Sequence, residues 1–486
     1  MQPSRAPRRR VAATVLLASS ALVLAACGSS TSDVPRARQV TPDVAFTGCD
    51  VVACSDTLNG AAFTIELPTT WNGTLLLYSH GYRNAQPVPP NFDPVSTTAA
   101  AASDEETART LLSQGYALAG SAYKSNGWAV ADGVTAAEDL YAYFSQKIGT
   151  PFRTIVWGDS LGGLITQTIA EKHPEWVDGV APLCGAVAGV VPNMNLALDV
   201  SFAVRTLLYP EMKLTGYATY EESVTTWTEA AKRVLAAASD TAGGGTAKVL
   251  YIAAISDAPD QTRTFDGSSI ESKVKATVEA LATGLGYATF ARYDLEQRFG
   301  GNPSSNEDTD YAARVSAEER ALIDAVTAGA TDANNALMQS GARIAADVAA
   351  RTKALAEGGD PQGTVSDPTI ALHTASDPLV LVQNQSFFAD RYRAAQAAGT
   401  ASGGLVQLFT VAPTSYPEAS GAPYGAGHCN FTSASRVAVI DLLTTWVQDG
   451  VFPGPEAIAS AMGPDSGYSA LFRPTGWPDP AALTAG

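Results

Sequence analysis

The sequence predicts an α/β fold built on a mostly parallel sheet with helices on both faces. Short apolar runs such as FRTIVW (residues 152–157) alternate along the chain with helix-like segments that end at glycine or proline. These runs are continuously apolar, which is typical of strands that are buried on both faces of a parallel sheet. The chain has 486 residues, of which 46% are hydrophobic, so it can bury a large core.

The first residues look like a targeting signal and not like part of this fold. Arg5 and the arginines at 8–10 precede the apolar run VAATVLLASSALVLAA, which ends in LAAC at residues 24–27. This pattern resembles the lipobox of bacterial lipoproteins, which implies a signal peptide over 1–26, lipidation of Cys27 and a polar tether over 27–45. We therefore expect a protein that is exported and held by its lipid on the outer face of the bacterial cell membrane, or released from there.

Residues 46–190 are predicted to form the first part of the core. AAFTIELPTTWNGTLLLYSHGY (61–82) contains two strand-like runs separated by a proline and a Trp-Asn-Gly turn, which favours a β-hairpin. The elements expected after it alternate between helix and strand: helix 104–114, strand 116–123, helix 132–148, strand 152–157, a helix ending near 172, and strand 176–184.

The alternation then stops and later resumes. Residues 191–365 are alanine-rich and helical in pattern, with capping boxes predicted at Ser268 to Glu271 and at Ser316 to Glu319, so we expect an inserted α-helical cap. Residues 366–486 are predicted to complete the core. Their expected elements are strand 367–374, helix 384–398, strand 404–411 and helix 433–448.

With Cys27 assigned to the lipid, four cysteines remain, an even number that suggests disulfides in an exported protein. Four cysteines allow three connectivities. The short spacing in GCDVVAC favours a bond between Cys49 and Cys54, and elimination then leaves Cys184 to pair with Cys429. The alternative for this second pair is two buried free thiols.

The formal net charge of −17 argues against nucleic acid as a partner, because basic clusters that could follow a phosphate backbone are absent outside the N-terminus. The four histidines are scattered along the sequence, and no nucleotide-type glycine loop is present. We therefore expect neither a metal nor an organic cofactor.

Residues 155–165, IVWGDSLGGLI, place Ser160 between a predicted strand and a predicted helix. The pattern G-x-S-x-G is weak by itself, but this context is the one that a nucleophile elbow requires. Gly158 and Gly162 lack the side chains that would collide in so tight a turn. Ser160 is therefore predicted to be a nucleophile; the alternative is a serine that caps a helix.

A serine hydroxyl needs a neighbouring base, usually an imidazole. His173 ends a predicted helix, His373 lies within an apolar strand, and His80 ends a core strand. His428 lies in the loop segment GAGHCNF between the last strand and the last helix, which makes it the predicted base.

The acid that orients the imidazole should follow a strand between the serine and the histidine. Asp377 in ALHTASDPLV meets this requirement, although it could also be a turn aspartate before proline. Other aspartates are less well placed, at the opposite edge of the sheet or in the insertion: Asp178, Asp367, Asp199 and Asp257. The expected oxyanion donors are the backbone N–H groups of Leu161 and of Tyr82, where Gly81 allows close approach.

Taken together, SHGY, GDSLG, SDP and GHC resemble the α/β-hydrolase superfamily, especially its exported bacterial members with a helical cap. The resemblance implies a triad of Ser160, Asp377 and His428, with Tyr82 and Leu161 as the oxyanion hole. A cysteine next to the histidine is similar to tannases and feruloyl esterases, in which a disulfide braces the triad. This chain differs from them because Asp159, not cysteine, precedes the serine.

The expected function is a serine hydrolase that cleaves small-molecule carboxylic esters through an acyl-enzyme on Ser160. The first alternative is a serine peptidase or aminopeptidase of the same fold, which would take a short peptide. The second alternative is a lipid-anchored binding protein without turnover. Trp128 and Phe202 are candidates for the wall of the substrate pocket, although aromatic residues at such positions are more often core.

Overall fold

The computed structural model describes residues 54–88, 92, 94–418 and 423–478. The strands of this part of the chain form one eight-stranded sheet in the order β1-β2-β4-β3-β5-β6-β7-β8. β2 runs antiparallel to β1 and β4, whereas the remaining neighbours are parallel. The strands are β1 (Ser55–Leu58), β2 (Ala61–Glu66), β3 (Thr74–Ser79), β4 (Ala117–Ser121), β5 (Arg153–Asp159), β6 (Gly179–Leu183), β7 (Thr369–Thr374) and β8 (Leu405–Thr410).

Helices connect these strands and also fill the long segment between β6 and β7. In the described ranges, none of them is long and apolar enough to cross a membrane. The helices that belong to the sheet layers are α1 (Glu105–Ser113), α2 (Val130–Lys147), α3 (Leu161–Lys172), α12 (Gln383–Ala398), α13 (Ser433–Asp449) and α14 (Pro455–Met462). Those between β6 and β7 are α4 (Val190–Leu207), α5 (Tyr220–Ala238), α6 (Gly245–Ser256), α7 (Ile270–Ala288), α8 (Phe290–Phe299), α9 (Ala317–Val326), α10 (Ala330–Ser340) and α11 (Val348–Glu357).

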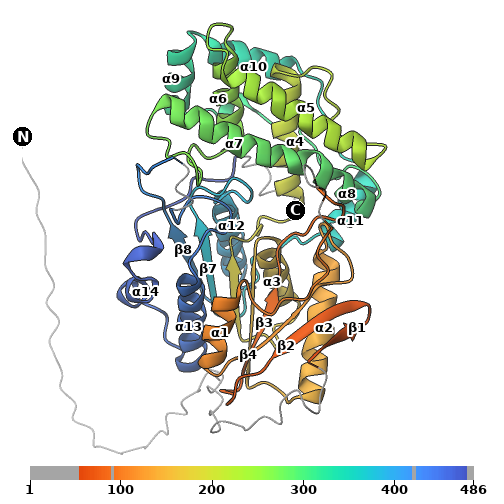
Figure 1. Ribbon diagram of the computed structural model, residues 1–486, viewed down its shortest axis with the longest axis vertical. Helices are drawn as coiled ribbons and strands as arrows, with labels where there is room; N and C mark the ends of the chain where they lie inside the picture. Colours follow the sequence, from red (N-terminus) through yellow and green to blue (C-terminus); the bar gives the residue numbers. More distant parts are fainter. Residues whose placement is uncertain (1–53, 89–91, 93, 419–422, 479–486) are drawn as a thin grey trace, which may run out of the picture. The chain divides into compact units, whose positions relative to one another are not determined.

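Two hydrophobic cores lie against the sheet, one on each face. The first is formed with α2 and α3 and includes Leu140, Phe144 and Ile165. The second is formed with α1 and α13 and includes Trp157 and Leu443. Figure 1 shows the two helix layers on either side of the strands. This mostly parallel sheet with both faces covered is the α/β-hydrolase fold, as predicted from the alternation of apolar runs and helices.

The strand pairing of residues 61–79 differs from the predicted hairpin. β2 pairs with β1 and β4, and β3 pairs with β4 and β5, so β2 and β3 are not neighbours. The burial of the two strands explains the difference. All residues of β3 are buried, which requires a place in the middle of the sheet, whereas alternate residues of β2 are only half-buried and suit a place near the edge. The turn at Asn59-Gly60 instead joins β1 to β2, as expected for this dipeptide.

The segment between β6 and β7, from Val190 to Glu357, is called the helical insertion below. Its helices pack on a core of their own, which includes Phe202, Tyr251 and Leu285, and they lie together in Figure 1. Its first and last helices also contribute to the core on the α2 and α3 face, through Val190 and Ala354.

Two helix starts in the helical insertion test the predicted capping boxes. The box from Ser316 to Glu319 is present at the start of α9. The prediction for Ser268 and Glu271 is wrong by one residue, because Ser269 caps α7 and accepts from the N–H of Ser272. Because Ser268 and Ser269 are adjacent, either could have been the N-cap from the sequence alone, and Ser268 precedes the N-cap.

Asp199 and Arg314 form a buried ion pair within the helical insertion. Arg314 Nη1 lies 2.9 Å from Asp199 Oδ2, and the two side chains are 5% and 2% exposed, respectively. The Tyr311 hydroxyl donates to the other carboxylate oxygen of Asp199 at 2.6 Å. Asp199 therefore has a structural role in the helical insertion and is not a partner of His428.

Replacing Asp199 by alanine should lower the free energy of unfolding by about 3–5 kcal/mol, because the buried guanidinium loses its carboxylate. The matched control is Asp332→Ala, which breaks the exposed pair with Arg320, where the side chains are 76% and 42% exposed. That variant should lose less than about 1 kcal/mol. Equal losses in chemical denaturation would contradict the expectation.

Candidate active site

Ser160 lies at the turn between β5 and α3, at the carboxyl edge of the sheet. Its backbone has φ 60° and ψ −124°, a conformation that is rare for a residue with a side chain. The Ser160 N–H donates to the carbonyl of Leu183 at 2.9 Å, which ties the turn to the end of β6. This strained strand-to-helix turn is the geometry of a nucleophile elbow.

The two glycines of the motif lie where no side chain fits. A Cβ at Gly158 would lie 2.4 Å from the carbonyl oxygen of Ser79, and one at Gly162 would lie 2.0 Å from the same atom. Any larger residue at either position would push the elbow away from the end of β3. The sequence interpretation of these glycines therefore has a direct steric cause.

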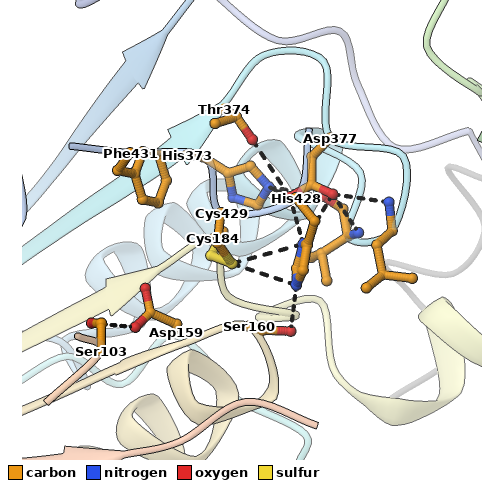
Figure 2. Close-up of a disulfide and its surroundings, with 12 residues drawn as sticks. Ser103, Asp159, Ser160, Cys184, His373, Thr374, Asp377, His428, Cys429 and Phe431 are labelled. Atoms are coloured by element: carbon orange, nitrogen blue, oxygen red, sulfur yellow. Dashed lines mark hydrogen bonds and ion pairs between the residues drawn. A yellow bond between two sulfur atoms is a disulfide. The ribbon is translucent and has the colours of Figure 1, made fainter. Parts of the chain in front are cut away.

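Ser160, His428 and Asp377 form a continuous chain of hydrogen bonds (Figure 2). His428 Nε2 lies 2.8 Å from Ser160 Oγ, and His428 Nδ1 lies 2.8 Å from Asp377 Oδ2. When Nδ1 carries the proton and donates it to the carboxylate, Nε2 has a free lone pair that can accept from the serine hydroxyl. The structure thus brings together the three residues predicted from the sequence.

Asp377 is fully buried in the turn after β7, and its carboxylate accepts several hydrogen bonds. Oδ1 accepts from the N–H groups of Leu379 and Val380 at 2.9 and 3.0 Å. Burial alone would raise the pKa of Asp377, but His428 and these donors outweigh it and lower the pKa below its usual value. The carboxylate is therefore ionised and oriented before any substrate binds.

The pKa of His428 is raised above its usual value. Burial lowers it, but the charges of Asp377 and Asp159 and the hydrogen bond to Asp377 outweigh burial. An imidazole with a raised pKa is a stronger base, which suits proton abstraction from a hydroxyl.

Asp159, next to the serine, belongs to a second polar group that reaches the histidine loop. Its Oδ2 accepts from the hydroxyls of Ser103 at 2.6 Å and Tyr78 at 3.0 Å. Its Oδ1 lies 3.5 Å from Arg436 Nε. Arg436 in turn donates to the carbonyl of Cys429 at 3.1 Å. Asp159 thereby connects the elbow, through Arg436, to the residue that follows His428.

Sequence reasoning missed Arg436, although a signal for it exists. Arg436 lies in the first turn of α13, where a positive charge is unfavourable next to the helix N-terminus. A cation at such a position suggests a specific acceptor, here Asp159 and the carbonyls of Cys429 and Phe431.

Cys184 and Cys429 form a disulfide, with their Cα atoms 5.4 Å apart. Cys184 directly follows β6 and Cys429 directly follows His428, so the bond fixes the histidine loop to the sheet next to the elbow (Figure 2). Cys54 is disulfide-bonded as well. Its predicted partner Cys49 and the predicted lipid site Cys27 lie outside the described residues.

The predicted oxyanion donors lie beside Ser160. Leu161 is the first residue of α3, and both Leu161 and Tyr82 line the same cavity as Ser160. A Cβ at Gly81 would lie 3.1 Å from Ser160 Cβ, so the loop after β3 passes close to the serine. A substrate carbonyl at Ser160 would therefore lie near the helix N-terminus.

The other histidines have partners of their own. His80 stacks on Tyr123 and donates from Nδ1 to the carbonyl of Gly81 at 2.7 Å, and burial lowers its pKa to about 4. His373 is fully buried, and its Nε2 lies 2.8 Å from the carbonyl oxygen of Val380. His173 lies at the end of α3 between Glu138 and Glu175. None of these three imidazoles hydrogen-bonds to Ser160 in the described part of the chain.

In the described part of the chain, the carboxylate that hydrogen-bonds to His428 is that of Asp377, and the remaining aspartates considered from the sequence have other surroundings. Asp178 accepts from the N–H of Thr154 near the start of β5, at the opposite edge of the sheet. Asp367 precedes β7 at that edge, where burial and then the charge of Asp178 raise its pKa to about 7. Asp257 follows α6 in the helical insertion, and burial followed by the charge of Glu319 raises its pKa to about 7.

A cavity lies directly beside Ser160. Its wall combines the loop after β7 with helices α4 and α7 of the helical insertion, and it is mostly apolar. The candidate Trp128 lines it and also belongs to the core on the α2 and α3 face, and it donates from Nε1 to the carbonyl of Gly358 at 2.7 Å. Phe202 does not line the cavity, because it is buried in the core of the helical insertion.

Among the described residues, one group of potential metal ligands lies close together: Cys184, His428 and Cys429. Both sulfur atoms of this group are bound in the disulfide, and the imidazole is hydrogen-bonded to Ser160 and Asp377. A metal ion would have to replace these bonds, so the group does not fit a metal site.

Comparison with known proteins finds one protein of similar sequence and several solved structures of similar fold. No protein-family model matches the chain. The o-phthalyl amidase of Xanthobacter agilis is 25% identical over 496 residues, which cover 92% of this chain and 98% of that protein. Feruloyl esterase B from Aspergillus oryzae is 15% identical, with a TM-score of 0.36 and coverage of 82% of this chain and 80% of that one. Proline iminopeptidase of Mycobacterium smegmatis is 11% identical, with a TM-score of 0.32 and coverage of 81% and 97%. The fold and the amidase relative support a hydrolase.

The charge of Asp159, added to the larger effect of Asp377 on the pKa of His428, should influence the acid side of a pH profile of this site. Because that charge raises the pKa of His428, Asp159→Asn should lower this pKa and leave the imidazole neutral at lower pH. The acid limb of kcat/KM for a p-nitrophenyl ester should therefore move to lower pH. Asp178→Asn, at the opposite edge of the sheet, is the control and should leave the limb in place. A shift to higher pH in Asp159→Asn would contradict the assignment.

Proposed function

We propose that this protein is a serine hydrolase that cleaves carboxylic esters through an acyl-enzyme on Ser160. The observation that carries the proposal is the hydrogen-bond chain from Ser160 Oγ through His428 to the buried, ionised Asp377. A serine hydroxyl that donates to an imidazole held by a carboxylate is the arrangement needed for nucleophilic attack at neutral pH.

The mechanism follows from these positions. Ser160 Oγ attacks the ester carbonyl carbon while His428 Nε2 takes the hydroxyl proton, and the oxyanion lies near the N–H groups of Leu161 and Tyr82. When the intermediate collapses, the carbon–oxygen bond to the alcohol breaks and His428 returns the proton to the leaving oxygen. Water then attacks the acyl-enzyme, gives its proton to His428, and the acid leaves as Ser160 recovers its proton.

Export and lipid anchoring at Cys27 remain part of the proposal. The disulfide between Cys184 and Cys429 supports a location outside the reducing cytosol, because disulfides persist in oxidising compartments. The membrane would then be a partner through the lipid alone, and the substrate would come from the surroundings of the cell.

Covalent labelling tests the nucleophile. A fluorophosphonate probe should label the wild-type protein, and Ser160→Ala should abolish labelling and lower kcat for p-nitrophenyl acetate by at least about a thousandfold. The labelled peptide should contain Ser160 in mass spectrometry. Labelling that persists in Ser160→Ala would refute the assignment, and a wild-type protein that neither labels nor turns over substrate would favour a binding protein.

An amide substrate is the second candidate, and the similarity to an o-phthalyl amidase favours it. The same triad can cleave esters and amides, so the two must be separated by rate. For matched acyl groups, we expect kcat/KM for p-nitrophenyl esters to exceed that for the corresponding p-nitroanilides. The panel should include an o-phthalyl anilide and an aminoacyl anilide. Faster cleavage of an anilide than of its matched ester would replace the esterase proposal by an amidase or a peptidase.

A further inference from the structure

The cavity beside Ser160 is mostly apolar, and none of the described residues that line it carries a charged side chain. Helix α4 contributes Met194 and Val200, α7 contributes Leu281, and the loop after β7 contributes Val380. Burying a charged group in such a space is costly, because no opposite charge lines it. The cavity therefore suits an uncharged, largely apolar or aromatic group.

The polar residues of this mostly apolar wall include Asn193, Ser256 and two tyrosines. Tyr82 comes from the loop after β3 and Tyr287 from the last turn of α7, and their rings pack at 5.4 Å between centroids with a tilt of 54°. They thus bring together the core and the helical insertion at the cavity that contains Ser160.

The hydroxyls of these two tyrosines are available for bonding. The hydroxyls of the neighbouring Tyr78 and Tyr123 donate to Asp159 and to the carbonyl of His80. In contrast, the hydroxyls of Tyr82 and Tyr287 have no hydrogen-bond partner within the described part of the chain. Both side chains are half-buried, so an acceptor on a ligand can bond to either hydroxyl without displacing a protein partner.

Both hydroxyls keep their protons. Burial raises the pKa of Tyr82 well above its usual value, and the charge of Asp294 raises it further, against the opposing effect of Arg298. Burial, followed by the charge of Asp377, raises the pKa of Tyr287 as well. Each phenol is therefore a neutral donor, and the nearby carboxylates make the position unfavourable for an anionic substituent.

We propose that the hydroxyls of Tyr82 and Tyr287 form a specificity site that binds an uncharged hydrogen-bond acceptor on the substrate. The substrate class is then an ester or amide whose apolar or aromatic acyl group carries a neutral oxygen substituent. This inference rests on the proposed function only in its use of Ser160 as the reacting group, because the binding site itself needs no turnover.

Binding to Ser160→Ala tests the site without catalysis. The probes are methoxybenzamides with the substituent at the ortho, meta or para position, and the matched ethylbenzamides and carboxybenzamides. Isothermal titration calorimetry should give a Kd for the best methoxy isomer that is roughly fivefold to tenfold lower than for its ethyl counterpart, as one hydrogen bond would provide. The carboxy compounds should bind more weakly than both.

Phenylalanine variants in the same Ser160→Ala background identify the donors. Tyr82→Phe or Tyr287→Phe should remove the preference for methoxy over ethyl while leaving the Kd of the ethyl compound nearly unchanged. Tyr392→Phe is the matched control, because its hydroxyl donates to the carbonyl of Gly403 and its side chain does not line the cavity. It should keep the preference.

Three outcomes would overturn the inference: no preference for methoxy over ethyl in Ser160→Ala, a preference that survives when Tyr82→Phe and Tyr287→Phe are combined in that background, or tighter binding of the carboxy compounds. Turnover of the matching p-nitrophenyl esters by the protein with Ser160 intact is a separate measurement. Absence of that turnover with the binding preference present would refute the proposed function and leave the binding site standing.

Discussion

The rest of the site depends on the close packing of backbone around Ser160. The serine can hold its strained conformation because Gly158 and Gly162 let the elbow contact the end of β3 without any Cβ between them. That contact also brings the loop containing Gly81 against the serine. The same close packing therefore fixes both the nucleophile and the predicted oxyanion donors, so that moving one would move the other.

The histidine must reach this fixed point from a loop far along the chain, and two connections hold it there. The disulfide joins the residue after His428 to the end of β6, and Arg436 joins the same residue to Asp159 beside the serine. Both connections act on the backbone next to the imidazole and leave its ring free to exchange protons. Asp159 contributes twice, since its charge also raises the pKa of His428.

The sequence predicted those parts that short motifs encode. The parallel sheet follows from apolar runs, and the placement of Ser160, Asp377 and His428 follows from strand ends, because the carboxyl ends of parallel strands meet at one edge. The pairing of β2 was missed because turn signals between two strands do not show whether these strands are neighbours in the sheet. Arg436 and Tyr287 were missed because their roles depend on contacts between segments that are distant in sequence.

The helical insertion forms much of the cavity wall, while the sheet layers position the triad. The reacting groups all lie on the sheet layers, but α4 and α7 form much of the cavity wall. The insertion has its own hydrophobic core and its own buried ion pair, which stabilise most of its helices separately from the sheet layers. Tyr82 and Tyr287 lie at the contact between these two parts. If the proposed function holds, a change in the cavity wall of the helical insertion would therefore alter which acyl group binds before it alters how the bond is broken.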